Sequence, residues 1–219
     1  MPKHLKNSTS RLIDISLPIS EGLPVWPGSC GVRVTHEQAL KEGAEANVTR
    51  LDTDVHIGTH VEGSLHFFPG GRSVDNISLD IFCGPALVVH LPTVDVVGAK
   101  ELEQLNLSTK PTRLLLRTKN SDLWVESNQK FREDYVGLTK DGAQWIVENG
   151  IRLIGMDYLS AAKYNDTIAV HRILLANDLT ILEGLDLSGA PAGEYELLCF
   201  PLKLIGVEAA PARALLRVL

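Results

Sequence analysis

The chain has 219 residues, of which 44% are hydrophobic and 22% are charged, and it carries a formal net charge of −6 with a pI of about 5.6. This length suits one large domain or two small ones and is enough to bury a substantial core. The acidic balance argues against nucleic acid or an anionic membrane as partner, and no window approaches the ~18 apolar residues that span a bilayer.

The beginning of the chain and its cysteines favour a cytoplasmic protein. The opening stretch MPKHLKNSTSRLIDISL has basic residues but lacks the apolar core of a signal peptide, so we expect a loose N-terminal segment over 1–11. Cys30, Cys83 and Cys199 form no Cys-x-x-Cys pair, which predicts three reduced, buried thiols. No linker divides the remainder, and 12–219 is expected to be a single domain.

Short apolar runs rich in β-branched residues follow and predict strands. Apolar residues at helical spacing interrupt them; TKDGAQWIVENG is the clearest case, with Thr139 as N-cap and Gly150 as the stop. Strands outnumber helices, and the early strands follow one another directly. This favours a mixed α/β (α+β) domain around a curved, partly antiparallel, barrel-like sheet flanked by a few helices. The predicted strands cover 11–19, 31–40, 46–56, 84–91, 112–119, 151–160, 179–187, 195–207 and 213–219, and the predicted helices cover 98–106, 139–150 and 166–178.

The stretch HIGTHVEGSLH, which begins at His56, places three histidines and a glutamate within eleven positions. On a regular strand His56 and His60 would lie about 13 Å apart, at roughly 3.3 Å per residue, which is too far for one metal ion. A turn at Gly58 would bring both together with Glu62, because glycine adopts the conformations that a sharp turn requires. Imidazole and carboxylate ligands suit zinc, manganese and other divalent metals. We therefore predict that the strand 46–56 ends at His56 and that a metal site follows it, rather than a set of hydrogen-bonded structural histidines.

A second pair of polar residues lies in apolar surroundings later in the chain. His171 is part of an otherwise apolar helix, and Glu183 is part of the apolar strand LTILEGL. A buried carboxylate is costly unless it is paired or bound to metal. Each residue alone could be structural, but a shared metal ion accounts for both.

HIGTHVEGSLH resembles the His-x-Gly-Thr-His-x-Asp-x-Pro-x-His signature of the cyclase family of metal-dependent hydrolases, which includes bacterial kynurenine formamidases and isatin hydrolases. Further segments resemble that family in the same order: LPVWPG (23–28), VHRILL followed by ILEGLDL, and FPLKLIGVEAAPARALL (200–216). The resemblance covers nearly the whole chain, from about residue 11 to 219. Two positions depart from the signature, since Glu62 replaces Asp and Ser64 replaces Pro.

The resemblance implies a site for one or two divalent metal ions, with zinc as the first choice and manganese as the next. In the family pattern, the carboxylates of Glu62 and Glu183 can bridge two ions. His66 takes the position of the proton-shuttling residue, and Trp26 falls where an aromatic side chain contacts the substrate. The metal ligands implied in this way are His56, His60, Glu62, His171 and Glu183.

The resemblance also implies an amidohydrolase that acts on carbon–nitrogen bonds other than peptide bonds, with a metal-activated water as nucleophile. The expected substrate is a small aryl formamide, such as N-formylkynurenine in tryptophan catabolism to kynurenine, or a cyclic amide. A small ester or lactone, or metal binding without catalysis, are the alternatives. A serine hydrolase that uses Ser64 is disfavoured because the sequence has no Gly-x-Ser-x-Gly elbow. The family further implies a homo-oligomer, dimeric or tetrameric, with a small-molecule substrate and no nucleic acid or membrane partner.

Overall fold

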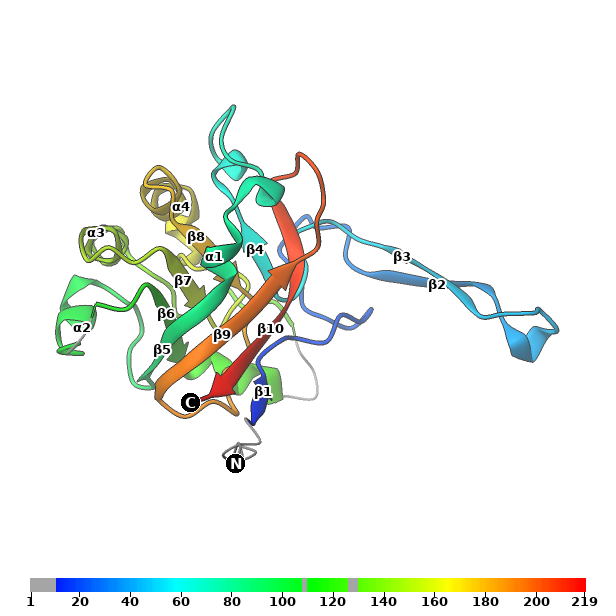
Figure 1. The fold of residues 1–219 in the computed structure, drawn as a ribbon, viewed down its shortest axis with the longest axis horizontal. Coiled ribbons are helices and arrows are strands. Elements are labelled where there is room, and N and C mark those ends of the chain that lie inside the picture. The colour runs from blue at the N-terminus through cyan, green and yellow to red at the C-terminus, as the bar shows by residue number, and fades with distance from the viewer. Residues whose placement is uncertain (1–10, 108–109, 126–129) are drawn as a thin grey trace, which may run out of the picture.

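The computed structural model describes residues 11–107, 110–125 and 130–219 (Figure 1). Of the segment 1–11 that we expected to be loose, only Arg11 lies within these ranges. The strands are β1 (Leu12–Asp14), β2 (Arg33–Gln38), β3 (Val48–Asp52), β4 (His60–Glu62), β5 (Cys83–Leu91), β6 (Arg113–Thr118), β7 (Leu153–Met156), β8 (Thr180–Glu183), β9 (Gly193–Pro201) and β10 (Ala209–Val218). The α-helices are α1 (Leu79–Phe82), α2 (Ala99–Glu103), α3 (Lys140–Glu148) and α4 (Thr167–Leu175).

Seven of these strands close into a barrel-like sheet. Hydrogen-bonded neighbours follow the order β1-β10-β4-β8-β7-β6-β5-β9, and β10 also pairs with β9, which closes the sheet. The long strand β10 allows this closure because one of its edges pairs with β9, while its other edge pairs first with β4 and then with β1. The predicted barrel-like, partly antiparallel sheet is confirmed.

The parallel part of the sheet carries the helices. β5, β6, β7 and β8 run parallel to one another, and the crossovers between them contain α2, α3 and α4 in turn. A parallel crossover returns over one face of the sheet, so these helices cover the outer face of the barrel (Figure 1). The three predicted helices are therefore confirmed. Thr139 caps α3 by accepting a hydrogen bond from the N–H of Gly142, and Gly150 follows its end with a φ of +73°.

Side chains along the strands alternate between two apolar layers. Leu115 of β6 packs inside the barrel together with Val61 of β4 and Leu182 of β8. Its neighbours Leu114 and Leu116 point the other way and pack under the helices. Each fully buried leucine contributes about 1.5–3 kcal/mol, so the two layers hold the barrel and the helices together. They also show that successive side chains of β4 and β8 point alternately into the barrel and outward toward the helices.

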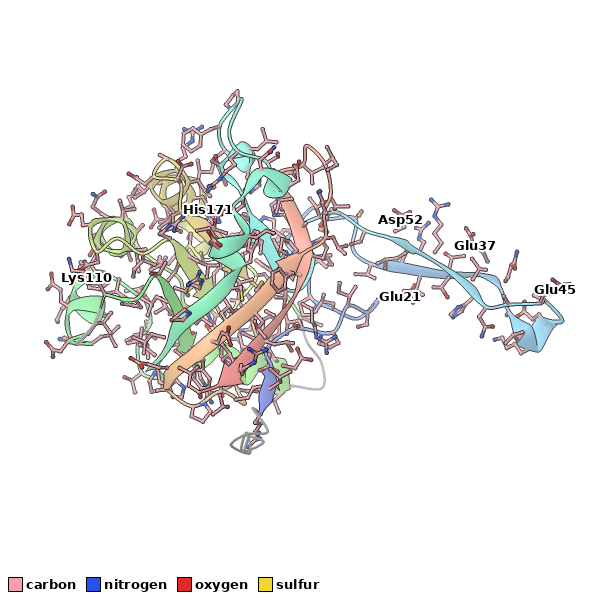
Figure 2. All side chains as sticks on the ribbon, in the orientation of Figure 1. Glu21, Glu37, Glu45, Asp52, Lys110 and His171 are labelled. Carbon is pink, nitrogen blue, oxygen red and sulfur yellow. The ribbon has the colours of Figure 1, made fainter. Side chains whose placement is uncertain are left out.

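β2 and β3 form a separate hairpin, which we call the arm (residues 33–52). The arm extends away from the barrel in Figure 1, and in Figure 2 its side chains, among them Glu37, stand clear of the rest of the molecule. Leu40, Val48 and Leu51 of the arm are exposed. The sequence predicts both strands, but their alternation does not reveal that they lie outside the barrel.

The strand predicted over 46–56 ends early. β3 stops at Asp52, and the carboxylate of Asp54 then accepts a hydrogen bond from the backbone N–H of His56 at 3.2 Å. This local turn replaces the strand ladder, so the prediction that the strand reaches His56 is wrong. The chain re-enters the sheet as β4, which we did not predict because three residues are too few to show an alternation.

The last two strands have shifted boundaries. β9 ends at Pro201, and the predicted strand residues 202–207 form the connection to β10 instead. This connection is required because β9 and β10 pair antiparallel and the chain must reverse between them. β10 then begins at Ala209, four residues before the predicted 213–219.

The three cysteines are free thiols, as predicted. Only Cys199 is buried, whereas Cys83 is half-buried and Cys30 is exposed, so the expectation of three buried thiols is wrong for two of them. Among the described residues, no helix is both long enough and apolar enough to cross a membrane.

Candidate metal centre

β4 and β8 present polar side chains on the face of the barrel that the helices cover. Their antiparallel register pairs His60 with Glu183 and Val61 with Leu182. Val61 and Leu182 pack inside the barrel, and side chains alternate along a strand, so His60, Glu62 and Glu183 face outward. Each of the three is only 2% exposed. The sheet therefore fixes one imidazole and two carboxylates side by side in a buried position.

Helix α4 contributes a second buried imidazole. His171 lies on the buried face of this helix, and its Nδ1–H donates a hydrogen bond to the carbonyl of Thr167 at 2.7 Å. Its Nε2 atom lies 3.1 Å from Oε1 of Glu183 and 3.6 Å from Oε2 of Glu62. The residues that we assigned to a shared metal therefore meet in the fold, although more than a hundred positions separate His171 from Glu62.

The predicted turn at Gly58 is present. Gly58 has a φ of +55°, and the nearby Gly184 has a φ of +67°. A β-carbon on Gly184 would lie 2.1 Å from the carbonyl oxygen of Gly58, so only glycine fits there. The hydroxyl of Thr59 donates to the carbonyl of Gly184 and accepts a hydrogen bond from the N–H of Leu17. The loop before β4 is thus locked against the chain that follows β8.

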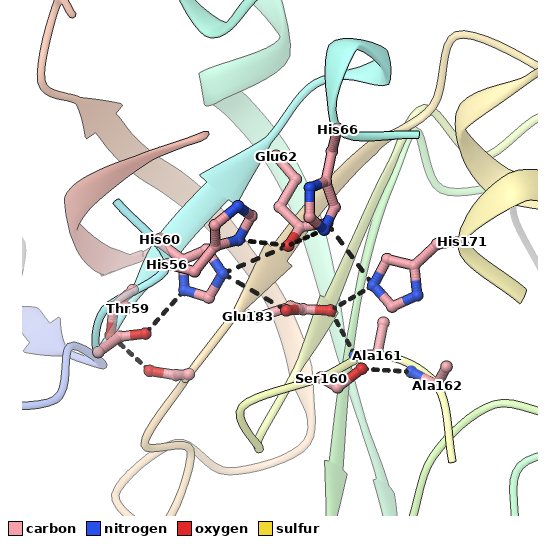
Figure 3. Close-up of polar contacts among 12 residues, drawn as sticks. His56, Thr59, His60, Glu62, His66, Ser160, Ala161, Ala162, His171 and Glu183 are labelled. Atoms are coloured by element: carbon pink, nitrogen blue, oxygen red, sulfur yellow. Dashed lines mark hydrogen bonds and ion pairs between the residues drawn. The ribbon is translucent and has the colours of Figure 1, made fainter. Parts of the chain in front are cut away.

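His56 and His66 complete the cluster at its more exposed side (Figure 3). Nδ1 of His56 lies 2.9 Å from Oε1 of Glu62, and its Nε2 lies 3.4 Å from Oε1 of Glu208. His66 ends the short 3-10 turn Ser64–His66. Its Nε2 lies 3.9 Å from Oε1 of Glu62. All six predicted ligand and proton-transfer residues therefore gather around one centre.

Hydrogen bonds on the far side of the rings fix which nitrogen faces this centre. Nδ1 of His60 lies 3.0 Å from the carbonyl oxygen of Gly58, and a carbonyl only accepts, so Nδ1 carries the proton. His171 is held by the same kind of bond. In the neutral rings, Nε2 lone pairs then face the carboxylate oxygens of Glu62 and Glu183. Among the residues that the structure describes, Nε2 of His60 and Oε2 of Glu62 find no hydrogen-bond partner although both are buried, and such facing acceptors fit a divalent cation between them.

The buried acids and imidazoles shift one another's pKa values. Burial alone would lower the pKa of His60, but the carboxylates of Glu183 and Glu62 beside the ring outweigh it and raise the pKa to about 10. The same opposition raises the pKa of His171 to about 9. Burial would raise the pKa of Glu62, but the imidazoles of His56 and His60 beside it hold that pKa well below its usual range. The cluster therefore holds ionised carboxylates whose charge protons or a metal ion must balance.

Within the described residues, two sets of ligand atoms are close enough together to hold an ion. One set is His60, Glu62 and Glu183, and the other is His56, Glu62 and His66, with all atoms of a set within 4.8 Å of one another. Glu62 belongs to both sets, which suits a carboxylate that bridges two ions. His66 is consequently placed where it could act either as a ligand of a second ion or as a proton-transfer group.

A cavity of about 490 Å³ opens onto the cluster. Its wall includes Trp26, whose ring centroid lies 5.2 Å from that of Phe131 and 5.4 Å from that of Tyr164. Phe67 also lines the cavity, and its ring lies 5.2 Å from the ring of His171. The predicted substrate-contacting tryptophan is therefore on the cavity wall, and the cavity offers aromatic surface next to the imidazoles and carboxylates.

Three contributions to the site were not predicted from the sequence. Asp54 orients the backbone of His56, and the backbone N–H of Ala161 donates to Oε1 of Glu183 at 2.5 Å. Glu208 contacts His56 from the far side of the ring. Asp54 could have been found from its position two residues before a candidate ligand, and Glu208 as a single acid in the apolar run IGVEAAPA. The role of Ala161 leaves no sequence signal because it uses the backbone alone.

Comparisons with known proteins agree with this geometry. The family model "Cyclase", described as "Putative cyclase", matches residues 13–163, which is more than half of the chain. The chain therefore belongs to the cyclase family.

Individual relatives match over most of their length. The chain is 37% identical over 215 residues to Cyclase-like protein 1 of Arabidopsis thaliana, covering 94% of this chain and 84% of that protein. It is 33% identical over 210 residues to the kynurenine formamidase of Bacillus cereus, covering 95% of this chain and 98% of that protein. A solved structure described as a "potential metal-dependent hydrolase with cyclase activity" has a TM-score of 0.81 and 30% identity, covering 94% of this chain and 97% of the other. The family that the sequence signature indicated is confirmed.

Proposed function

We propose that this chain is a metal-dependent hydrolase of a small amide, with an aryl formamide such as N-formylkynurenine as its preferred substrate. The observation that carries the proposal is the convergence of imidazoles and carboxylates beside a cavity with an aromatic wall. The likeness to a kynurenine formamidase along almost the whole chain supports the choice of a formamide. The likeness to a structure described as a metal-dependent hydrolase supports the choice of a metal.

The donor set suits zinc first and manganese next, with one or two ions per chain, because imidazole and carboxylate oxygen bind both metals. His60, His171 and Glu183 would hold one ion and His56 the other, with Glu62 between them. When bound, such an ion supplies Lewis acidity, which polarises a carbonyl and makes water a nucleophile near neutral pH.

His66 would accept a proton from the attacking water and return it to the leaving nitrogen. Burial lowers the pKa of His66 below its ordinary value, so its ring is neutral at neutral pH and has a lone pair available. The side chain is 30% exposed and lines the cavity, which gives it access to substrate. Trp26 and Phe67 offer apolar faces that would orient an aryl group and exclude water from the reacting bond.

The alternatives use the same site differently. A small ester or lactone would need the same polarised carbonyl and the same proton transfer. Metal binding without catalysis agrees with plant relatives whose names state no substrate. A serine nucleophile fits the structure less well, because Ser64 is buried and its hydroxyl accepts a hydrogen bond from the backbone N–H of Arg72 at 2.7 Å. That bond orders the loop that carries His66.

Hydrolysis of N-formylkynurenine before and after treatment with a chelator tests the proposal. We expect activity that disappears when metal is removed and returns when zinc or manganese is added. A parallel panel with a lactam, a lactone and a simple ester measures the substrate range. Full activity after complete removal of metal would contradict metal dependence, and a metal-loaded protein that hydrolyses no member of the panel would support the non-catalytic alternative.

Replacement of Glu62 tests the bridging carboxylate. Glu62→Gln should lower the affinity for both ions, because a neutral amide is a poorer ligand than a carboxylate and Glu62 belongs to both ligand sets. Glu62→Asp restores the residue of the family signature and should keep more of the affinity and the rate. Equilibrium dialysis with zinc measures the affinity, with Glu103→Gln on the exposed end of α2 as control. Unchanged zinc binding in the glutamine variant would show that Glu62 contacts no ion.

A further inference from the structure

Glu208 lies behind His56, on the side of the ring away from the metal centre. Oε1 of Glu208 is 3.4 Å from Nε2 of His56, while Nδ1 of the same ring faces Glu62 at 2.9 Å. The backbone of Glu208 is fixed, because its carbonyl accepts a hydrogen bond from the N–H of Gly63 at 2.8 Å, immediately before Ala209 pairs with β4. The sheet thus fixes the backbone from which this carboxylate reaches the ring.

The hydrogen bonds of His60 and His171 indicate what kind of contact the far nitrogen of the His56 ring needs. His60 and His171 each donate Nδ1–H to a backbone carbonyl, which leaves Nε2 for the centre. His56 has the opposite orientation, with Nδ1 toward the centre and Nε2 away from it. That Nε2 atom is buried and makes no hydrogen bond within the described residues. The carboxylate of Glu208 is the acceptor that faces it.

We infer that Glu208 is a positioning residue for His56: when an ion takes the Nδ1 lone pair, the ring must carry its proton on Nε2, and the Glu208 carboxylate 3.4 Å away is the acceptor for that N–H. The inference rests on the proposed metal function of this site. A carboxylate on the far nitrogen of a ligating histidine orients the ring and strengthens it as a ligand, and loss of such a partner lowers metal affinity about 10- to 100-fold. Glu208 itself belongs to neither ligand set.

Competition between the protein and a chromophoric chelator for zinc tests this inference without an activity measurement. Glu208→Gln should weaken the zinc site that contains His56 about 10- to 100-fold, while the zinc content at saturation stays that of the unmodified protein. Glu208→Asp keeps a carboxylate and should recover part of the affinity. Glu196→Gln is the matched control, because Glu196 is also a partly exposed acid in an ion pair, with Arg217, away from the cavity. Its zinc affinity should not change.

A second readout separates positioning from general stability. The ¹⁵N shifts of the His56 ring should show the Nε2–H tautomer in the zinc-loaded unmodified protein and a mixture of tautomers in Glu208→Gln at the same zinc concentration. Zinc binding that is equal in the unmodified protein and in Glu208→Gln would overturn the inference but not the metal site. A lower number of zinc ions at saturation would also overturn it, because Glu208 would then be a ligand. An unmodified protein that binds no zinc would instead refute the proposed function.

Discussion

Replacement of His66 by glutamine is expected to lower kcat roughly 100- to 10,000-fold, the usual worth of general acid–base catalysis, while zinc content stays nearly intact. The ring is partly exposed to the cavity and lies 3.9 Å from Glu62, farther than the other imidazoles lie from their carboxylates. The buried set of His60, Glu62 and Glu183 does not need it to hold an ion. Steady-state kinetics and metal analysis of the same preparation provide both measurements.

The pH dependence of the activity provides a second test of the role of His66. His66 must be neutral to accept a proton, so activity should fall as the pH drops through its pKa, and this acid limb should move or disappear in the glutamine variant. His90→Gln is the control, because His90 is half-buried on β5 and hydrogen-bonds to the carbonyl of Ala190 outside the cavity. A zinc-loaded His66→Gln protein with normal kcat would exclude proton transfer by His66. A variant that loses part of its zinc would instead identify His66 as a ligand.

The second large effect is expected from His60→Ala. His60 is 2% exposed, and its Nε2 lies 3.5 Å from Glu62 and 3.4 Å from Glu183. Its loss should remove most of the bound metal and leave two buried carboxylates without their shared partner. An ion present at 100 times its Kd stabilises the folded state by about 2.7 kcal/mol. Since 1 kcal/mol shifts Tm by about 2–4 °C in a chain of this size, added zinc should raise the Tm of the unmodified protein by roughly 5–10 °C and that of the variant far less.

Elemental analysis and thermal unfolding with and without zinc measure this effect. His90→Ala serves as control and should keep both its zinc and its zinc-dependent rise in Tm. A His60→Ala protein with full zinc occupancy would mean that the ion lies elsewhere.

The sequence predicts much of the site because several of its residues are local. His56, His60 and Glu62 are close in the chain, and a glycine between the histidines signals the turn that joins them. His171 and Glu183 are distant, but each is a polar residue in an apolar element, and such a residue needs a partner. The residues that escaped prediction depend on pairing between strands. Glu208 reaches His56 only because β10 is hydrogen-bonded to β4, and no local pattern encodes that register.

The same distinction applies to the fold. Alternating apolar residues predict β2 and β3 as well as they predict the barrel strands, because the pattern reports an extended chain and not its neighbours. Whether such a strand joins the barrel is decided by long-range contacts, which leave the arm outside it. The alternation of apolar residues does not predict β4. Two of its three residues are polar site residues, so the segment has the polarity of a loop.

Closure of the barrel by β10 determines when the metal centre can form during protein synthesis. The ribosome makes the HIGTHVEGSLH stretch early, but β8 and β10, the two neighbours of β4, come from the last fifth of the chain. Until β8 has been made, β4 has no strand on either side, and until β10 has been made one of its edges stays unpaired. On the proposed function, metal capture is therefore an event of the finished chain, and a product that stops before β10 should neither close its barrel nor retain an ion.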